Sequence, residues 1–279
     1  MRTILVPVDV TSASENAVGV AIEWGKQYGY NHIILLTTTY QSMFDYITIG
    51  EEYINQEQVD AKLLLKRLRG KITERTSTIK VTTEVSELPL LRCTIELIRN
   101  NASVELVILG SDHNVVDNDS FISENLISIA RTSPVKVLIV PDSYVYGVVN
   151  NILVPCDINN IESLDRISIF NSVLVREDAH LMLLNVATKG KSGITDNKKK
   201  EWEEKIRQIF PDIPYNIYYS IHDDIVEGIF SFTSSNKVDL IIALPDKHSF
   251  LYYLANKSIS EGIYLNADQA IMILKQANP

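Results

Sequence analysis

Short hydrophobic runs alternate along the chain with longer stretches in which hydrophobic residues recur every three or four positions. The runs in the first half are rich in β-branched residues and leucine, which indicates strands buried on both faces of a parallel sheet: ILVPV, HIILLTT, IKVTTEV, VELVILG and VKVLIVP. Between them, Ala17, Ala21 and Trp24 show helical spacing, and Ser12 and Glu15 have the spacing of a capping box. Strands alternating with helices predict a doubly wound α/β layer with right-handed crossovers.

The second half repeats this order of elements. ILVPVD at residues 4–9 returns as ILVPCD at residues 152–157, an offset of 152 − 4 = 148 residues. VELVILG and VDLIIAL are offset by 238 − 104 = 134, and the last strands by 269 − 135 = 134. One net deletion of 148 − 134 = 14 residues between the first and fourth strands accounts for all three offsets. The sequence therefore predicts a tandem duplication, with domains at residues 1–145 and 146–279 and a short linker at residues 142–150.

Composition and charge exclude several classes of function. Of the 279 residues, 46% are hydrophobic and 22% are charged, as in an ordinary globular protein. The formal charge of −9 opposes binding to nucleic acid or to an anionic membrane. The opening residues lack the features of a signal peptide, and no apolar run is long enough to span a bilayer, so we expect a cytoplasmic protein. Cys93 and Cys156 are expected to be buried thiols.

The opening strand, its Ser/Glu/Asn-rich turn, VELVILGSDH and SPVKVLIVP resemble the universal stress protein family. The resemblance covers both halves, and the tandem arrangement is similar to that of the two-domain members found in bacteria. It implies two Rossmann-like domains of the adenine nucleotide alpha hydrolase-like type. Because single domains of the family pair through their last strands, it also implies an intrachain pseudo-dimer with residues 135–140 alongside residues 270–275. A further homodimer is compatible with this arrangement.

Some members of the family bind ATP or AMP through a loop with the pattern Gly, two residues, Gly, nine residues, Gly and Ser or Thr. Glycines let backbone N–H groups approach phosphates at a helix N-terminus. In the first half Gly110 matches, but His113, Ser123 and Glu124 occupy the other three positions. A glutamate there competes for the positive end of the helix dipole and repels a triphosphate. We expect the first half not to bind ATP in the family manner.

In the second half the same positions hold Leu244, Lys247, Lys257 and Ser258, so only the serine matches. The two lysines would attract an anion as point charges, but without glycines the backbone cannot surround a phosphate closely. We favour lysines on a solvated surface and keep an ATP or AMP site in this half as the alternative.

Two aspartates and one polar loop remain candidates for a ligand site. Asp9 and Asp157 follow the first strand of each half, where open α/β sheets place ligand crevices. The matching family aspartate lies near bound adenosine, but either residue could equally cap the next helix. The loop with Asp112, His113, Asp117 and Asp119 lacks EF-hand spacing and is predicted to be polar surface without a metal.

No motif for catalysis is present: the sequence contains neither a P-loop, nor a GxSxG elbow, nor an HExxH pair. We therefore expect a non-catalytic universal stress protein that requires no cofactor and whose output depends on a protein partner or small ligand. The alternatives are an adenine-nucleotide sensor that uses one half, and a slow nucleotide hydrolase or phosphotransferase.

Overall fold

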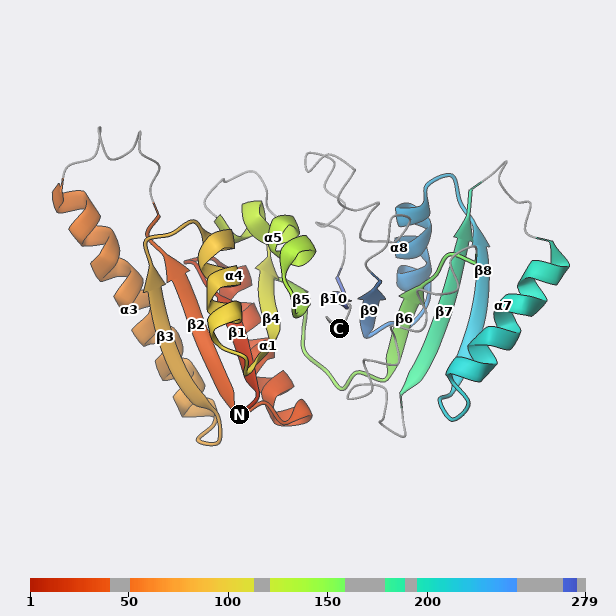
Figure 1. Cartoon of the computed structure of the whole chain (residues 1–279), viewed down its shortest axis with the longest axis horizontal. Helices are drawn as coiled ribbons and strands as arrows, with labels where there is room; N and C mark the ends of the chain where they lie inside the picture. Colours follow the sequence, from red (N-terminus) through yellow and green to blue (C-terminus); the bar gives the residue numbers. More distant parts are fainter. Residues whose placement is uncertain (41–50, 113–120, 159–178, 189–194, 245–267, 275–279) are drawn as a thin grey trace. The chain divides into compact units, whose positions relative to one another are not determined.

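The computed structural model describes residues 1–40, 51–112, 121–158, 179–188, 195–244 and 268–274. Its contacts divide the chain into two compact units, Met1–Tyr144 and Val145–Pro279. Each unit is an α/β layer with a parallel sheet, so the predicted fold class is confirmed for both halves of the chain (Figure 1). The predicted pairing of the two units through their last strands remains a prediction.

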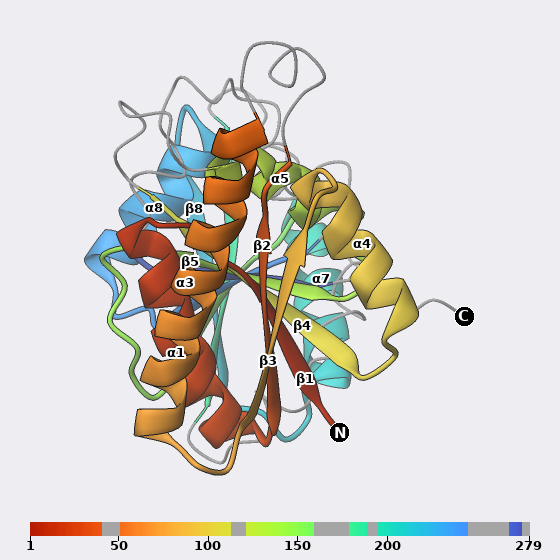
Figure 2. The same cartoon turned by 90° about the vertical axis from the view of Figure 1, so that its left-hand side faces the viewer.

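In the first unit the strands take the order β3-β2-β1-β4-β5, all parallel. The elements are β1 (Thr3–Pro7), α1 (Ser12–Tyr28), β2 (His32–Thr38), α3 (Glu51–Arg75), β3 (Lys80–Ser86), α4 (Leu90–Asn100), β4 (Val104–Ser111), α5 (Phe121–Thr132) and β5 (Lys136–Pro141). The chain moves outward from β1 to β3 and then returns to β4 and β5. Right-handed crossovers therefore place α1 and α3 on one face of the sheet and α4 and α5 on the other (Figure 2).

The second unit has the strand order β10-β9-β6-β7-β8, also parallel. Its described elements are β6 (Asn151–Pro155), β7 (His180–Ala187), α7 (Asp196–Ile209), β8 (Tyr215–Ile221), α8 (Ile225–Ser235), β9 (Leu240–Ala243) and β10 (Ala270–Ile273). The Trp202 ring of α7 packs against Tyr219 at a tilt, and Phe232 of α8 packs edge-to-face against the neighbouring Tyr218. Because consecutive strand residues point to opposite faces, α7 and α8 lie on opposite faces of the sheet. The helices predicted at residues 161–174 and between β9 and β10 lie outside the described residues.

Strand register locates the deletion that separates the two copies. In the first unit Ile33 pairs with Val81, and in the second Leu181 pairs with Tyr215. The β2 and β7 positions differ by 181 − 33 = 148, whereas the β3 and β8 positions differ by 215 − 81 = 134. The 14 missing residues therefore belong between β7 and β8. The helix in that interval has 25 residues in the first unit and only 14 in the second.

The start of α1 differs from the prediction by one residue. Thr11 is the N-cap, and its hydroxyl oxygen accepts a hydrogen bond from the backbone N–H of Ser14 at 3.3 Å. Ser12 is already helical, so the predicted Ser12–Glu15 capping box was wrong. Glu15 instead forms ion pairs with Arg67 and Lys71 of α3.

Candidate functional site

The carboxyl ends of β1 and β4 define the crevice position in the first unit. From β1 the chain crosses to β2 on one side, and from β4 it crosses to β5 on the other. Ligands of open α/β sheets bind at such a switch point, outside the carboxyl ends of the strands. Asp9 directly follows β1 and Gly110 lies near the end of β4, so two of the predicted site residues reach this edge.

Asp9 is buried, and its side chain holds the turn between β1 and α1. Its Oδ1 accepts hydrogen bonds from the Thr11 backbone N–H at 3.0 Å and from the Ser14 hydroxyl at 2.6 Å. The Thr11 hydroxyl donates to the same oxygen, and the Asp9 N–H donates to Ser14 Oγ at 3.0 Å. Of the two roles predicted for Asp9, these contacts support the capping role. Thr11 and Ser14 were missed, although their spacing before a helical stretch was a signal for them.

Gly110 packs directly against the first turn of α1. A Cβ atom at this position would lie 2.4 Å from the carbonyl oxygen of Ala13 and 2.9 Å from the backbone nitrogen of Ser14. No side chain fits there because both neighbours are backbone atoms of one helix turn. Gly110 therefore permits close contact between β4 and α1, and Ser14 lies beside both Gly110 and Asp9.

The last strand of the first unit is fastened to the same helix by Asn16. The Asn16 amide donates to the carbonyl oxygens of Pro141 and Tyr144, both at 2.8 Å. The Asp142 N–H donates to the Ser111 carbonyl at 3.0 Å and continues the link between β5 and β4. Nothing in the sequence marked Asn16, because an isolated helical asparagine has no characteristic partner.

The other loop positions of the first unit are only partly within the described residues. Ser123 and Glu124 lie in the first turn of α5, whereas His113, Asp117 and Asp119 lie outside the described residues. Asp112 is half-buried just after β4. Within the described ranges no group of histidine, cysteine, aspartate and glutamate residues could hold a metal ion.

In the second unit Asp157 is half-buried after β6, at the position that matches Asp9. The neighbouring Cys156 is buried: its thiol donates to the Val154 carbonyl at 3.1 Å, and its carbonyl accepts from the Asn185 amide at 3.0 Å. Burial, reinforced by the charge of Asp157, raises the pKa of the Cys156 thiol far above its usual range. The thiol therefore stays protonated and unreactive.

The matching position for Gly110 in the second unit is Leu244, which is 3% exposed. A buried leucine side chain thus occupies the position at which the first unit has a glycine, and the second unit's counterpart of α1 lies outside the described residues. Lys247, Lys257 and Ser258 lie outside the described residues, and their convergence on one crevice stays a prediction.

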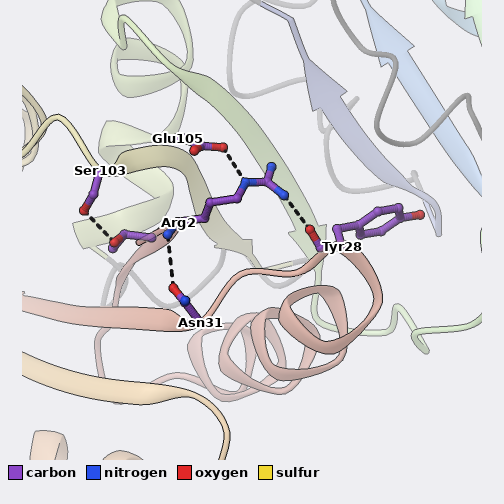
Figure 3. Close-up of polar contacts among 6 residues, drawn as sticks. Arg2, Tyr28, Asn31, Ser103 and Glu105 are labelled. Atoms are coloured by element: carbon purple, nitrogen blue, oxygen red, sulfur yellow. Dashed lines mark hydrogen bonds and ion pairs between the residues drawn. The ribbon is translucent and has the colours of Figure 1, made fainter.

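A polar network lies at the opposite, amino-terminal end of the first sheet. Figure 3 shows Arg2 donating to Glu105 Oε2 at 2.9 Å and to the Tyr28 carbonyl at 2.6 Å, while its backbone N–H donates to Asn31 Oδ1 at 3.1 Å. The guanidinium also lies 4.2 Å from the Tyr30 ring centroid. Burial raises the pKa of Tyr30 to about 12. Glu105 pairs with the arginine, so the network joins β1, the end of α1 and β4 as a structural clamp.

Comparison with known proteins identifies the family. The model of the universal stress protein family matches residues 1–141. The chain belongs to the universal stress protein family. None of the curated proteins matches the chain.

Solved structures extend the likeness of this universal stress protein to its second unit. A universal stress protein from Archaeoglobus fulgidus DSM 4304 has a TM-score of 0.70 and 15% identity, over 98% of this chain and 96% of that chain. A functionally unknown protein from Pseudomonas aeruginosa PAO1 has a TM-score of 0.60 and 14% identity, over 99% and 93%. The cytoplasmic domain of a prokaryotic cation chloride cotransporter has a TM-score of 0.55 and 14% identity, over 100% and 97%. At these identities the likeness shows a shared tandem fold.

Among the described helices of this universal stress protein, none combines the length and the apolar character that a bilayer crossing requires.

Proposed function

We propose that this universal stress protein is a non-catalytic, cytoplasmic regulatory module whose output depends on a protein partner or a small ligand. The observation that carries the proposal is the packing of Gly110 beneath α1. Among the four loop positions of the first half, this glycine alone fits the family pattern, and the space that a side chain would need there is filled by the backbone of Ala13 and Ser14.

The neighbouring carboxylate supports the same proposal. Three donors from Thr11 and Ser14 already converge on one oxygen of Asp9. A phosphate site needs backbone N–H groups that point into an open crevice. At this sheet end the described polar groups of the β1–α1 turn bond to one another, which supports the expectation that the first unit does not bind ATP in the family manner.

The absence of catalysis in the proposal rests on chemistry. A hydrolase or phosphotransferase needs a nucleophile or water-positioning base beside electrophilic donors. In the described part of the chain, the Thr11 and Ser14 hydroxyls at this sheet end hydrogen-bond to Asp9 at the start of α1. The nearest thiol of the second unit, Cys156, is buried and protonated.

Calorimetric titration of ATP, ADP and AMP into the intact chain tests the proposal, with Lys247→Ala and Lys257→Ala as matched variants. We expect no binding in the submillimolar range for any of the three nucleotides. Micromolar binding that both lysine variants lose would favour the alternative nucleotide sensor in the second half. Steady release of phosphate from ATP would favour the slow hydrolase instead.

Asp9→Asn tests the first unit separately. The amide oxygen of asparagine can still accept from the turn, so the variant should fold and leave the calorimetric result unchanged. The proposal for the first unit would be contradicted if the wild type and both lysine variants bound a nucleotide and Asp9→Asn did not.

The pairing of the two units as a pseudo-dimer through residues 135–140 and 270–275 belongs to the same proposal. It rests on the family resemblance and on the presence of two like units in one chain. In such a pseudo-dimer the carboxyl ends of both sheets would be held in a fixed arrangement toward a partner or ligand.

A further inference from the structure

Among the described residues, no strand pairs with the outer side of strand β8. It is the outermost strand of the second unit's sheet (Figure 1). The Pro214 carbonyl accepts from Leu181 N–H at 2.9 Å, and the His222 N–H donates to the Ala187 carbonyl at 3.0 Å. Even-numbered residues therefore direct their backbone groups to β7. By the alternation of a strand, the odd-numbered residues direct theirs outward: Tyr215, Ile217, Tyr219 and Ile221.

The corresponding edge of the first unit is protected by charge. In β3, Lys80 and Glu84 are exposed, and Glu87 is exposed just beyond the strand. Charged side chains on an edge strand oppose pairing with another chain. By the offset of 134 residues, Ile221 occupies the position of Glu87, and β8 contains no charged residue from Tyr215 to Ile221.

The missing residues between β7 and β8 expose the same edge. The helix that accompanies β3 has 25 residues, whereas α7 beside β8 has 14. Tyr219 packs on Trp202 of α7 with ring centroids 6.0 Å apart, yet it remains 39% exposed, and Ile221 is 61% exposed. Ile217, Tyr219 and Ile221 lie on the α7 face of the strand because strand side chains alternate. They form an apolar row directly beside the outward backbone groups.

Charges of both signs flank the middle of this row. The Lys199 Nζ lies 4.9 Å from the Tyr219 ring centroid, and the Tyr219 hydroxyl donates to Glu203 Oε1 at 2.9 Å. The two residues lie one turn apart on α7, and both are half-buried beside Tyr219. A two-fold axis at the level of Tyr219 would place Lys199 of each copy beside Glu203 of the other copy. An isologous contact requires such a self-complementary patch.

We propose that β8 is a homodimer interface, at which it pairs antiparallel with β8 of a second copy of this chain about a two-fold axis at Tyr219. In this register Ile217 lies opposite Ile221 of the other copy. These residues then exchange backbone hydrogen bonds through the groups that already point outward. The interface joins the two apolar rows and extends the parallel sheet by an antiparallel junction. It is separate from the last-strand pairing within the chain.

Sedimentation velocity of the full chain, from micromolar to hundreds of micromolar concentration, tests the interface. We expect the wild type to shift reversibly from 31.5 kDa toward twice this mass. Ile221→Glu restores the charge that Glu87 supplies in β3 and should abolish the shift. Val59→Glu makes the same change at a 48% exposed site on α3 and should leave the dimer intact. Circular dichroism and a thermal melt establish that both variants are folded.

Cysteine cross-linking tests the register. Residues directly opposite in a hydrogen-bonded antiparallel pair have Cα atoms about 5.5 Å apart, within disulfide reach. Tyr219→Cys should therefore form a disulfide-linked dimer on mild oxidation. Ser220→Cys should cross-link far less, because residue 220 does not lie opposite residue 220 of the second copy. The native thiols are both buried and should not interfere.

Three results would overturn the proposal. They are a wild-type chain that stays monomeric throughout, an Ile221→Glu variant that dimerises as the wild type does, and cross-linking of Tyr219→Cys no greater than that of Ser220→Cys. With a monomeric wild type, the edge would remain available to an extended peptide of another protein, as in β-strand addition.

Discussion

At position 110 a glycine is required by its neighbours in the fold. Its missing side chain lets the backbone of Ala13 and Ser14 approach β4, and the same turn uses Asp9 as a hydrogen-bond acceptor. A residue that looks like the remnant of a phosphate loop is therefore also a packing residue.

Gly110→Ala should lower the free energy of unfolding by about 1–3 kcal/mol, because the new methyl group overlaps helix backbone that cannot move independently. Gly70→Ala is the matched control: it lies within α3 with no atom within 4 Å of its added Cβ. The control should stabilise the chain by up to about 1 kcal/mol through helix propensity. Urea unfolding of both variants measures the difference, and equal values would refute the packing role.

The hydrogen bonds of the buried His32 determine which of its two ring nitrogens carries the proton. The Ser103 hydroxyl donates to Asn101 Oδ1 at 2.7 Å, so Thr3 Oγ1, also at 2.7 Å, must donate to Ser103. Because the Thr3 hydroxyl proton is donated to Ser103, Thr3 Oγ1 accepts a hydrogen bond from His32 Nδ1 at 3.0 Å. His32 Nε2 then accepts from the Thr82 hydroxyl at 3.0 Å. Neutral His32 therefore carries its proton on Nδ1.

Burial lowers the pKa of His32, and the charge of Lys80 lowers it further. Between this folded pKa and the unfolded value of about 6.5, only the unfolded chain binds the proton, so the unfolding free energy falls as pH decreases. His32→Gln should lack this component. Urea unfolding of both proteins from pH 8 to pH 5 measures it, and nitrogen chemical shifts of the imidazole identify the tautomer. Parallel pH profiles would contradict the prediction.

At the scale of elements, the length of one helix distinguishes the two units. In the first unit α3 is long enough for Arg67 and Lys71 to reach Glu15 of α1, at 2.7 and 2.5 Å. In the second unit α7 is shorter, and the missing residues leave part of β8 exposed. One deletion thus accounts for both the shorter helix and the more exposed sheet edge.

The hydrogen bond from Lys71, with the charge of Arg67, lowers the pKa of Glu15. This stabilisation is present above the unfolded pKa of about 4.3 and is lost as pH falls through the lower folded value. Because all three side chains are partly exposed, Glu15→Gln should cost less than about 1 kcal/mol at pH 7. Glu23→Gln, which removes a pair with Lys26 within one helix, is the control. Urea titrations at pH 7 and pH 3 should show the Glu15 difference disappearing in acid, and a constant difference would refute the assignment.

At the scale of the whole molecule, each unit carries one of the two tryptophans. Trp24 of α1 is 2% exposed in the first unit, and Trp202 of α7 is fully buried in the second. The Trp202 Nε1 has no hydrogen-bond partner, so replacement by phenylalanine removes no hydrogen bond. Single-tryptophan variants can therefore report on the two units separately.

If the two units pair as proposed, Trp24→Phe and Trp202→Phe should show coincident fluorescence transitions in urea. Adding Gly110→Ala to either variant should then move both transitions together, because unfolding one unit removes the partner surface of the other. If only the transition reported by Trp24 moves, the units unfold independently and the pseudo-dimer proposal fails.

The sequence by itself determined the fold class, the family and the duplication. Buried parallel strands produce unbroken β-branched runs such as HIILLTT, amphipathic helices produce three-to-four periodicity, and both are local signals that survive in each copy. The right-handed crossovers of a doubly wound layer followed from a general rule, whereas the order of strands came from the structure. Even the size of the deletion could be obtained by counting.

Only the tertiary structure decided which contacts the described candidate site residues make. Whether Asp9 caps a turn or faces a ligand depends on where Ser14 lies, and the role of Gly110 depends on how closely α1 approaches β4. The exposure of Ile221 likewise depends on how far α7 extends along β8. Such roles arise from contacts between elements distant in sequence, and a local pattern specifies the elements but not the distances between them.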